Sequence, residues 1–365
     1  MIELRAAASP GEVRIAAVAG ERLRDYAIWR PGAPDGIGDL HRGRVVSIVP
    51  AMAGAFVALG DAEGFLPDSE GARGLTEGAI IGVRITRSAQ GGKGPRLRVA
   101  AAEEGGPPGL VQRGPDPLAD LAARYPHAAV TVDDRSLQAS LRASLGERVQ
   151  FDPAAFTDAQ EAAIEALAQA DVELPNGVRL SFHPTPALVA IDVDAGRSLA
   201  GGRGKTAHHL VVNQVVLPEL AAQIRLRNLS GAIVVDLAGM ALRRRAELGP
   251  TFAAALAGDP LAPRFLGFSA LGLAEILRPR RRPPLHELLA GPHAAGLAAL
   301  RTILAGQDPD PRRLPALRAS PPVIEALRRD PVALADLARR SGRDLMLRAD
   351  PSLPATGWIT EEKHG

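Results

Sequence analysis

The sequence predicts a protein of mixed α and β structure that is built from several domains. At 365 residues the chain has room for about two or three domains with buried cores. Two apolar, β-branched-rich runs, 187–192 and 231–236, each end in an aspartate and are separated by a helical stretch. A series of short runs punctuated by glycine fills residues 37–100 and predicts a separate all-β domain.

The composition favours Ala/Leu/Val-packed structure and gives little bulk charge for recognising a polyanion. Hydrophobic residues make up 46% of the chain, aromatic residues 3%, and the formal net charge is +2. Local basic clusters would therefore have to provide any contact with nucleic acid. The chain has no cysteine, which excludes disulfides and thiolate metal sites. Without a run of 18 apolar residues, and with charges early in residues 1–20, we expect a cytoplasmic protein with no membrane segment.

The N-terminal part predicts an incomplete sheet followed by a barrel. Within residues 1–35, two weakly alternating runs predict strands at 13–18 and 23–29 whose sheet must be completed elsewhere. Five strands fit a small barrel of the oligonucleotide-binding type. They are expected at 43–49, 54–59, 64–66, 80–85 and 96–99.

The segments after the barrel alternate between helices and strands. Residues 103–116 are rich in Gly and Pro and predict a loop. Between 117 and 171 we expect a helix at 118–125, a strand at 128–132, and helices from Ser136 and from a Thr157 cap. Near the C-terminus we expect helices at 295–304, 321–328 and 332–340 and a strand at 344–348.

The two runs that end in aspartate predict a βαβ unit. Residues 206–229 between them read as mostly helical, with Pro218 as the first residue of a second helix. A right-handed crossover makes the two strands parallel, and sites in such sheets form at the carboxyl ends of the strands. We therefore expect Asp192 and Asp236 at the same edge of one sheet.

Asp192, Asp194 and Asp236 are candidate metal ligands. Asp192 and Asp194 share one strand face, with Cα atoms about 6.7 Å apart for a rise of about 3.3–3.4 Å per residue. Carboxylates so placed suit Mg²⁺, which prefers oxygen ligands, and Asp236 would contribute from the next strand. The alternative is that they are polar strand ends or helix caps, and the pattern alone names no substrate.

The residues around these aspartates resemble a known family. The run PTPALVAIDVDAGR (184–197) and the run AAQIRLRNLSGAIVVD (221–236) resemble the catalytic core of the ribonuclease E/G family, which cuts single-stranded RNA internally with Mg²⁺. The resemblance implies that Asp192 and Asp236 are the catalytic aspartates that bind the metal ion. Asp194 stands at the position of a family asparagine, so its role as a third ligand is open.

The same resemblance implies which residues contact RNA. Arg197, Arg225 and Arg227 lie in the two motifs. Residues 43–67 resemble an S1 RNA-binding domain, in which bases stack on aromatic rings and basic groups neutralise phosphates. This implies that Phe56, Phe65 and Lys93 bind RNA, whereas packing into the barrel core is the alternative for each phenylalanine.

The resemblance also implies a four-part architecture. It consists of a ribonuclease H-like subdomain (1–36 with 103–171), an inserted S1 barrel of the OB type (37–102), a DNase I-like α/β catalytic subdomain (172–293) and a small C-terminal α/β domain (294–365). A homodimer through the C-terminal domain is consistent with the family. No long tail follows, so we expect no degradosome-type scaffold for partner enzymes.

Several family features are missing from this sequence. The module that senses an RNA 5′-monophosphate is absent, and Ala270 replaces an arginine of the family pattern. Gly239 replaces a second aspartate that follows Asp236. Residues 286–293 stand where the family has its zinc-binding cysteines, and they contain no thiol. We therefore expect neither 5′-monophosphate sensing nor zinc.

Other patterns are less specific. The run GKT at 204–206 lacks the first glycine of a phosphate loop, because Leu199 stands there. His208, His209, His286 and His293 have no metal-like spacing and read as structural. The arginine runs 243–245 and 278–282 are either solvated faces or phosphate contacts, and a helix is expected before Arg278.

These observations predict an Mg²⁺-dependent endoribonuclease with one metal ion, which hydrolyses single-stranded RNA to 5′-phosphate and 3′-hydroxyl ends. The main alternative is an RNA-binding protein of the same fold with little or no nuclease activity, motivated by the missing family features. An unrelated α/β hydrolase or synthase is disfavoured, because the sequence has no nucleophile motif.

Overall fold

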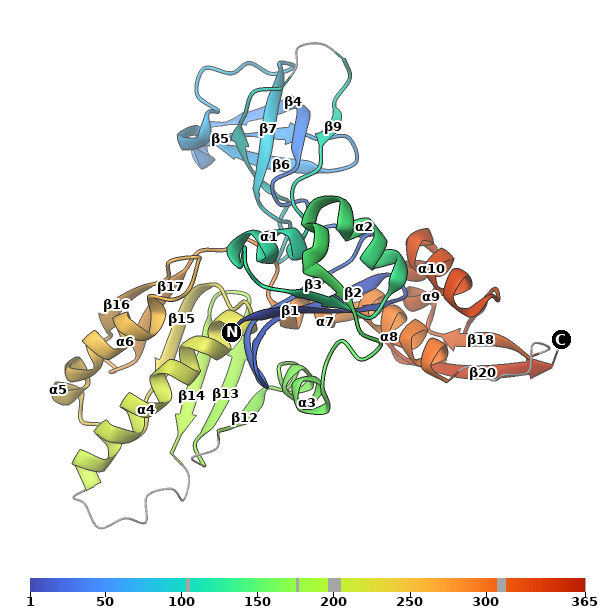
Figure 1. Cartoon of the computed structure of the whole chain (residues 1–365). Helices are drawn as coiled ribbons and strands as arrows, with labels where there is room; N and C mark the ends of the chain where they lie inside the picture. The colour runs from blue at the N-terminus through green and yellow to red at the C-terminus, as the bar shows by residue number, and fades with distance from the viewer. Residues whose placement is uncertain (103–105, 175–176, 196–204, 307–312, 365) are drawn as a thin grey trace. The chain divides into compact units, whose positions relative to one another are not determined.

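The computed structural model shows two compact units (Figure 1). Unit 1 consists of Met1–Thr157 and His286–Gly365, and unit 2 of Asp158–Leu285, whereas the sequence resemblance drew the catalytic part at 172–293. The structure describes residues 1–102, 106–174, 177–195, 205–306 and 313–364, with the backbone alone for 205–209, 313–314 and 362–364. Of the helices it describes, none is both long and apolar enough to cross a bilayer.

The first sheet of unit 1 is assembled from two separate stretches of the chain. Its strand order is β11-β10-β1-β2-β3, with β10 parallel to both β1 and β11. The strands are β1 (Glu3–Ser9), β2 (Glu12–Ala19), β3 (Arg22–Trp29), β10 (Val130–Val132) and β11 (Val149–Phe151). The N-terminal strands thus find the rest of their sheet beyond the barrel residues, as the sequence predicts.

Two capped helices cover this sheet. Helix α1 (Pro117–Arg124) begins after Asp116 and α2 (Arg135–Leu145) after Asp134, followed by the short turn η3 (Gly146–Arg148). Each of these aspartates accepts a hydrogen bond from a backbone N–H in the first turn of its helix, at 2.8 and 2.7 Å, which satisfies one otherwise unpaired donor. Their apolar faces pack on Leu4 and Ile15 of the sheet.

The barrel of unit 1 is closed by five strands. The ring runs β4-β5-β6-β8-β7 and returns to β4, and β9 is added on the outer edge of β4. The elements are β4 (Leu40–Val49), η1 (Pro50–Met52), β5 (Gly54–Ala58), β6 (Glu63–Pro67), η2 (Asp68–Glu70), β7 (Ile80–Arg87), β8 (Arg96–Val99) and β9 (Gly109–Gln112). The predicted strands are confirmed, and the barrel is of the S1/OB-like kind. The prediction of a loop over 103–116 was wrong at residues 109–112, which form β9. This is an edge strand, and its Leu110 and Val111 are exposed.

In the C-terminal part of unit 1, α8, α9 and α10 pack on a three-stranded sheet of order β19-β18-β20. Its elements are α7 (Leu285–Leu289, which begins at the last residue of unit 2), α8 (Gly291–Ala305), β18 (Arg313–Ala319), α9 (Pro321–Arg328), α10 (Pro331–Ser341), β19 (Met346–Ala349) and β20 (Trp358–His364). Leu300, Leu317 and Leu327 are fully buried between the layers. The predicted helices are confirmed, and β18 and β20 complete the sheet that the predicted strand begins.

Unit 2 contains a six-stranded mixed sheet of order β12-β13-β14-β15-β17-β16. Its elements are α3 (Asp158–Ala166), β12 (Asp171–Glu173), β13 (Arg179–Pro184), β14 (Val189–Asp194), α4 (Lys205–Leu226), β15 (Gly231–Asp236), α5 (Leu242–Arg245), η4 (Ala246–Leu248), α6 (Gly249–Leu256), β16 (Arg264–Phe268) and β17 (Ala274–Arg278). Strands β14 and β15 are parallel neighbours, which confirms the βαβ unit.

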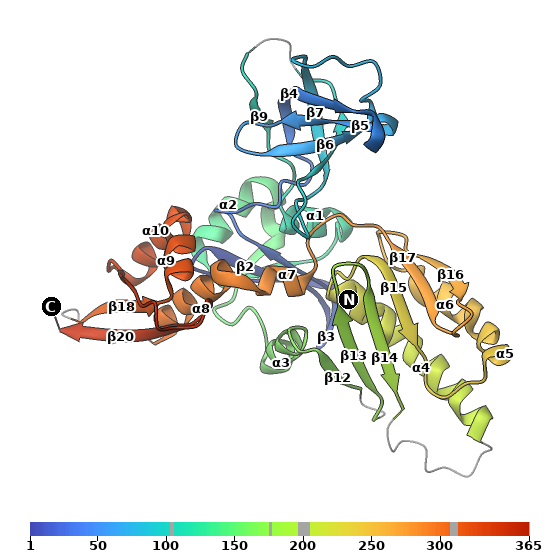
Figure 2. The same ribbon diagram turned by 180° about the vertical axis from the view of Figure 1, so that it is seen from behind.

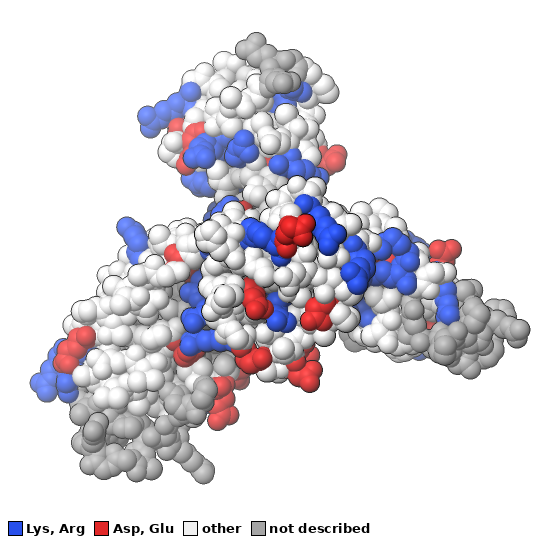
Figure 3. All heavy atoms as spheres, viewed as in Figure 1, with Lys and Arg blue, Asp and Glu red and all other residues white. Residues whose placement is uncertain are grey.

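Helices α4 and α6 cover one face of this sheet, as the two opposite views show (Figures 1 and 2). Ile191 and Val235 point to that face and bury against Leu220 and Ile224 of α4. In Figure 3 the part of unit 2 that lies over these helices shows few charged side chains. Because side chains alternate along a strand, the polar residues of β13, β14 and β15 point to the opposite face.

Two expectations for unit 2 were wrong. Pro218 lies inside one continuous helix and does not begin a second one. Pro218 and Gln214 are both exposed, so the carbonyl that loses its N–H partner at the proline faces solvent. The helix expected before Arg278 is strand β17, in which Ala274, Ile276 and Arg278 are buried in strict alternation.

Candidate functional site

Asp192 and Asp236 are register partners on adjacent parallel strands. The pairing runs from Val189 with Ile233 to Asp192 with Asp236, so Asp236 ends β15 and Asp192 lies beside it, two residues before the end of β14. Partners in register point to the same face, and neighbouring strands lie about 4.8 Å apart. The two carboxylates therefore stand side by side on the face of the sheet that α4 and α6 leave uncovered.

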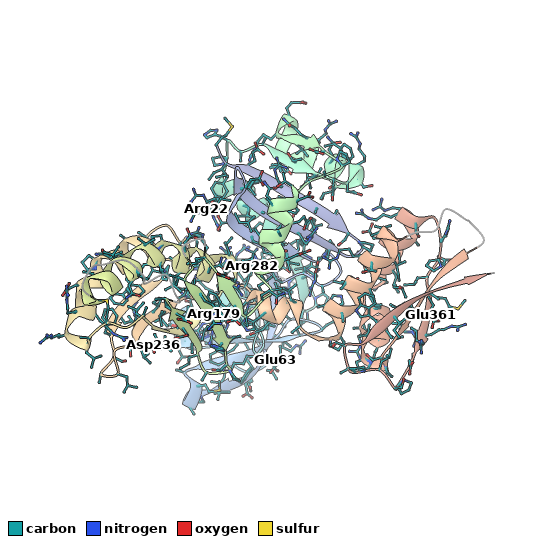
Figure 4. The ribbon with its side chains drawn as sticks, turned by 90° about the horizontal axis from the view of Figure 1, so that it is seen from below. Arg22, Glu63, Arg179, Asp236, Arg282 and Glu361 are labelled. Atoms are coloured by element: carbon teal, nitrogen blue, oxygen red, sulfur yellow. The ribbon has the colours of Figure 1, made fainter. Side chains whose placement is uncertain are left out.

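The local sequence explains this placement. Ile191 and Val235 come directly before the two aspartates and are 2% and 0% exposed, which fixes the register of both strands through burial. Both aspartates are exposed, and the Asp236 side chain retains 57% of its accessible surface. Figure 4 labels Asp236 at one end of its strand. The pair is therefore open to solvent and to a substrate.

Asp194 lies on the same face but is held by an arginine. It pairs in register with Arg179 of β13, and Nη2 of Arg179 lies 3.1 Å from Oδ2 of Asp194. Both side chains are about half exposed, so the ion pair is solvated and weak. Figure 4 also labels Arg179. Asp194 is thus near the carboxylate pair but turned to a cation that the sequence analysis did not single out.

The row that contains the two aspartates extends across four strands. Ser181 of β13 is the register partner of Asp192, and Asp171 of β12 is the partner of Ser181. The Ser181 hydroxyl donates a hydrogen bond of 2.5 Å to Oδ1 of Asp171. Asp171 is therefore a third carboxylate in the same row, and its Oδ1 already accepts the hydrogen bond from Ser181.

The donor set suits a hard divalent cation. Two exposed carboxylates in register provide oxygen ligands, and Mg²⁺ is commonly held by one or two carboxylates, with water and phosphate oxygens completing its shell. In the described part of the chain, no group of three or more His, Asp or Glu side chains is close enough together to hold a metal ion. The residues that fit a cation here are Asp192 and Asp236, with Asp194 close by.

Arg227 and Arg225, both expected to contact RNA, differ in their surroundings. Arg227 is 6% exposed, and its guanidinium donates to the carbonyls of Gln169 (2.6 Å) and Ala166 (3.1 Å) and lies 4.2 Å from the centre of the Phe182 ring. Burial lowers the pKa of Arg227 to about 10. In this structure Arg227 joins α3 to the sheet, while Arg225 is only half-buried.

The other arginines expected to contact RNA differ in whether they are exposed. Arg197 falls in 196–204, outside the described residues, as do Leu199 and Gly204 of the phosphate-loop comparison. Arg278 is 2% exposed and donates to both oxygens of the buried Asp259, so it does not face a phosphate. Arg243 is exposed.

In the barrel, the two expected aromatic residues form one pair. Phe56 and Phe65 are register partners on β5 and β6, both half-buried, with ring centroids 5.5 Å apart and planes at 64°. Arg96 of β8 is the next partner in the row, beside Phe65. Lys93 is exposed, in a turn closed by two 3.1 Å backbone hydrogen bonds with Gln90. The barrel thus presents aromatic and basic side chains together.

Sequence reasoning missed several residues around the carboxylates. Ser181 and Arg179 alternate with buried Leu180 and Phe182 in β13, so the period-two pattern could have placed them on the polar face. Arg245 was noted only as part of a basic run, yet its Nη1 lies 3.2 Å from Oδ1 of Asp236. No local signal could have found that contact, because it depends on how a loop folds back.

Helices on one face of the sheet, paired carboxylates on the other and an S1/OB-like barrel are together consistent with proteins that process nucleic acids. Residues 132–281 match the model of the ribonuclease E/G family. This match, together with relatives named ribonuclease E and ribonuclease G, supports the similarity of the chain to the ribonuclease E/G family.

Three relatives illustrate the extent of the similarity. Ribonuclease E of Nostoc sp. is 37% identical over 130 residues, 35% of this chain and 18% of the relative. Ribonuclease E of Haemophilus influenzae is 25% identical over 387 aligned residues, 76% of this chain and 41% of the relative. Ribonuclease G of Escherichia coli is 30% identical over 143 residues, 38% of this chain and 29% of the relative. The matches therefore span less than half the length of each of these relatives.

Proposed function

We propose that this protein is a divalent-metal-dependent endoribonuclease that hydrolyses single-stranded RNA, in RNA processing or decay. The observation that carries the proposal is the register pairing of Asp192 with Asp236, which sets two exposed carboxylates side by side on an uncovered face. Similarity to the ribonuclease E/G family model and to relatives named ribonuclease E and ribonuclease G supports the same activity.

Asp192 and Asp236 would hold one Mg²⁺ ion, and Asp194, on the same face of the sheet, would become a further ligand only on leaving Arg179. When bound, the ion supplies Lewis-acid chemistry, which lowers the pKa of bound water and offsets charge on the phosphoryl oxygens. The proposed ligands are carboxylate oxygens, with no histidine or cysteine among them. Such a set favours the hard cation Mg²⁺ over zinc. Zinc is also not expected because residues 286–293, at the place of the family's zinc-binding cysteines, contain no thiol.

The chain's own residues then have separate tasks. Asp192 and Asp236 bind on the open face, where an RNA strand can approach without unfolding any element. Arg225 and Arg197 are proposed phosphate contacts that position the strand without reading its sequence. Water attacks phosphorus in place of the ribose 2′-hydroxyl, so the products carry 5′-phosphate and 3′-hydroxyl ends.

The barrel is proposed to bind the RNA strand. Phe56 and Phe65 offer ring surfaces for base stacking, and Lys93 and Arg96 offer charge for phosphates. We also propose the four-part division, with a ribonuclease H-like part, an S1 barrel, a DNase I-like part and a small C-terminal domain. The sheet order in unit 1 and the closed barrel support that division.

The deciding experiment is cleavage of a labelled, AU-rich single-stranded RNA with Mg²⁺ and with a chelator. We expect internal cuts only with the metal, and products that a 5′-phosphate-dependent exonuclease degrades. Products with 2′,3′-cyclic phosphate ends would contradict hydrolysis by water.

A second candidate is an RNA-binding protein with little or no nuclease activity. It is favoured by the arginines that engage Asp194 and Asp236, and by Gly239 at the position of a family aspartate. Such a protein would show salt-dependent RNA affinity, with log K falling about 0.7 per phosphate contact per log unit of salt, and no turnover with Mg²⁺.

We further propose a homodimer through residues 294–365, which sedimentation of the whole chain would test. A monomer at micromolar concentration would rule it out.

A further inference from the structure

Arg245 connects the proposed active site to two loops of unit 2. It is the last residue of α5, and its Nε donates to the carbonyl of Met240 at 3.1 Å. Its Nη1 donates to the carbonyl of Gly272 at 2.5 Å and to Oδ1 of Asp236 at 3.2 Å. A longer contact of 3.5 Å reaches the carbonyl of Leu237. One guanidinium therefore joins the loop after β15, the turn before β17 and the carboxylate of Asp236.

The position of this guanidinium is fixed by its surroundings. The Arg245 side chain is 11% exposed, whereas that of Asp236 is 57% exposed. Gly272 has a φ of +84°, and a Cβ there would collide with Leu242 and lie 3.3 Å from Nε of Arg245. Because Gly272 has no side chain, Leu242 and Arg245 can pack closely against it. Only arginine has enough donors in one plane to make these contacts together.

The two proposed metal ligands consequently differ. Asp236 has one oxygen engaged by a fixed cation, which leaves Oδ2 for another partner. Asp192 has no hydrogen-bond or ion-pair partner among the residues that the structure describes. An ordinary surface ion pair would not fix a carboxylate, but here the arginine is held by backbone carbonyls on both sides, so it can hold Asp236 in one orientation.

We propose that Arg245 is a positioning residue that orients Asp236 and whose fixed positive charge weakens the affinity of the carboxylate pair for a divalent cation. This inference rests on the proposed function. In such a site the metal ion binds more weakly, but the orientation of its ligand Asp236 is fixed. If Arg245 only joins two loops, its replacement should lower stability but should not make metal binding tighter while cleavage becomes slower.

The test measures Mn²⁺ binding by electron paramagnetic resonance, together with cleavage rate at saturating Mg²⁺, on the whole chain. Arg245→Gln removes the charge and should bind Mn²⁺ about five- to tenfold more tightly, the size expected for a unit charge about 6–8 Å from a divalent ion in water. Its cleavage rate should fall by about tenfold or more, because Asp236 is no longer held. Arg245→Lys keeps the charge but not the fork, so Mn²⁺ affinity should stay within about twofold while the rate falls.

Arg244→Gln is the matched control. Arg244 is the adjacent residue of α5 and pairs with Glu247 at the surface, so the variant should leave both readouts unchanged. Unchanged or weaker Mn²⁺ binding in a folded Arg245→Gln protein would overturn the proposal. If that variant does not fold, a wild-type cleavage rate in Arg245→Lys overturns it instead.

The same measurements separate this inference from the proposed function. If Asp192→Asn binds Mn²⁺ as well as the wild type does, the carboxylate pair is not the metal site and the proposed function fails. If Asp192→Asn loses Mn²⁺ binding but Arg245→Gln binds it as the wild type does, only the role of Arg245 fails.

Discussion

Arg179 and Asp194 face each other across β13 and β14 and form an ion pair of 3.1 Å beside the two proposed catalytic aspartates. The family resemblance places an uncharged asparagine at position 194, so the charge of Asp194 is additional in this chain. Arg179 offsets that charge within the same face of the sheet. The pair therefore keeps the charge near Asp192 close to that of a site with two carboxylates.

Removal of Arg179 should release the third carboxylate. We expect Arg179→Ser to strengthen Mn²⁺ binding by about two- to fivefold, a small effect because the pair is solvated. Asp194→Asn should bind Mn²⁺ nearly as the wild type does, and the double variant should behave like Asp194→Asn. Equal metal affinity in Arg179→Ser and in the wild type, measured by titration, would show that Asp194 does not reach the metal.

Substitution of either register-paired aspartate should abolish cleavage. Asp192→Asn and Asp236→Asn are each expected to reduce the rate by about a thousandfold, the order seen when a group that stabilises the transition state is removed. RNA affinity should remain, because the barrel belongs to unit 1 and the two aspartates belong to unit 2. Asp171→Asn is the matched control, since this carboxylate lies in the same row but accepts a hydrogen bond from Ser181. Substantial cleavage by Asp192→Asn would refute the assignment.

The aromatic pair of the barrel should contribute to RNA binding. Phe65→Leu keeps an apolar side chain but loses the ring, and should weaken binding of a single strand by about 1–3 kcal/mol, the range for one base stacked on one ring. Phe56→Leu should act in the same direction. Fluorescence anisotropy gives the affinity, and a melting curve checks that the barrel is intact. A folded Phe65→Leu protein with wild-type affinity would assign this residue to packing alone.

Lys93 should act through charge. Because it is exposed in a turn, Lys93→Gln is expected to reduce the slope of log K against log salt by about 0.7, the value for one phosphate contact with a single strand. The melting temperature should not change. An unaltered slope over 50 to 200 mM salt, a range in which such contacts are measurable, would remove Lys93 from the interface.

Arg227 and Arg225 should separate into a structural and a functional role. Arg227→Gln leaves the carbonyls of Ala166 and Gln169 without their donor, and is expected to lower the free energy of unfolding by about 3 kcal/mol. Arg225→Gln should have a smaller effect on stability and should raise the KM for RNA. Urea denaturation and steady-state cleavage provide the two readouts. A stable Arg227→Gln protein with weakened RNA binding would reverse the assignment.

Cleavage should be indifferent to the 5′ end of the RNA. Strand β9 of the barrel is followed after four residues by α1, and the family resemblance implies that the 5′-sensing motif is missing from this sequence. Two RNAs that differ only in a 5′-hydroxyl or a 5′-monophosphate should therefore be cut at rates within about twofold, well under the tenfold that 1.4 kcal/mol of recognition would produce. A strong preference for the monophosphate in a competition assay would contradict this.

The limits of sequence-based prediction follow from which interactions are local. The barrel strands, the βαβ unit and the C-terminal helices were predictable, because each depends on periodicity and turn residues within a short window. Strand β1 was not, since its run of alanines has low β propensity and forms a strand only between β2 and β10. The stretch 274–278 was not predictable as a strand either, since its alternation is only five residues long and a helix was expected before Arg278.

The sequence by itself determined that Asp192 and Asp236 would lie side by side on neighbouring parallel strands, because burial of the residue before each aspartate sets the register. It also determined the composition of the barrel face around Phe56 and Phe65. Only the tertiary structure decided that Arg179 and Arg245 reach Asp194 and Asp236, and that Arg227 is buried. Those contacts join residues from different strands and loops, and their geometry depends on packing that no local pattern encodes.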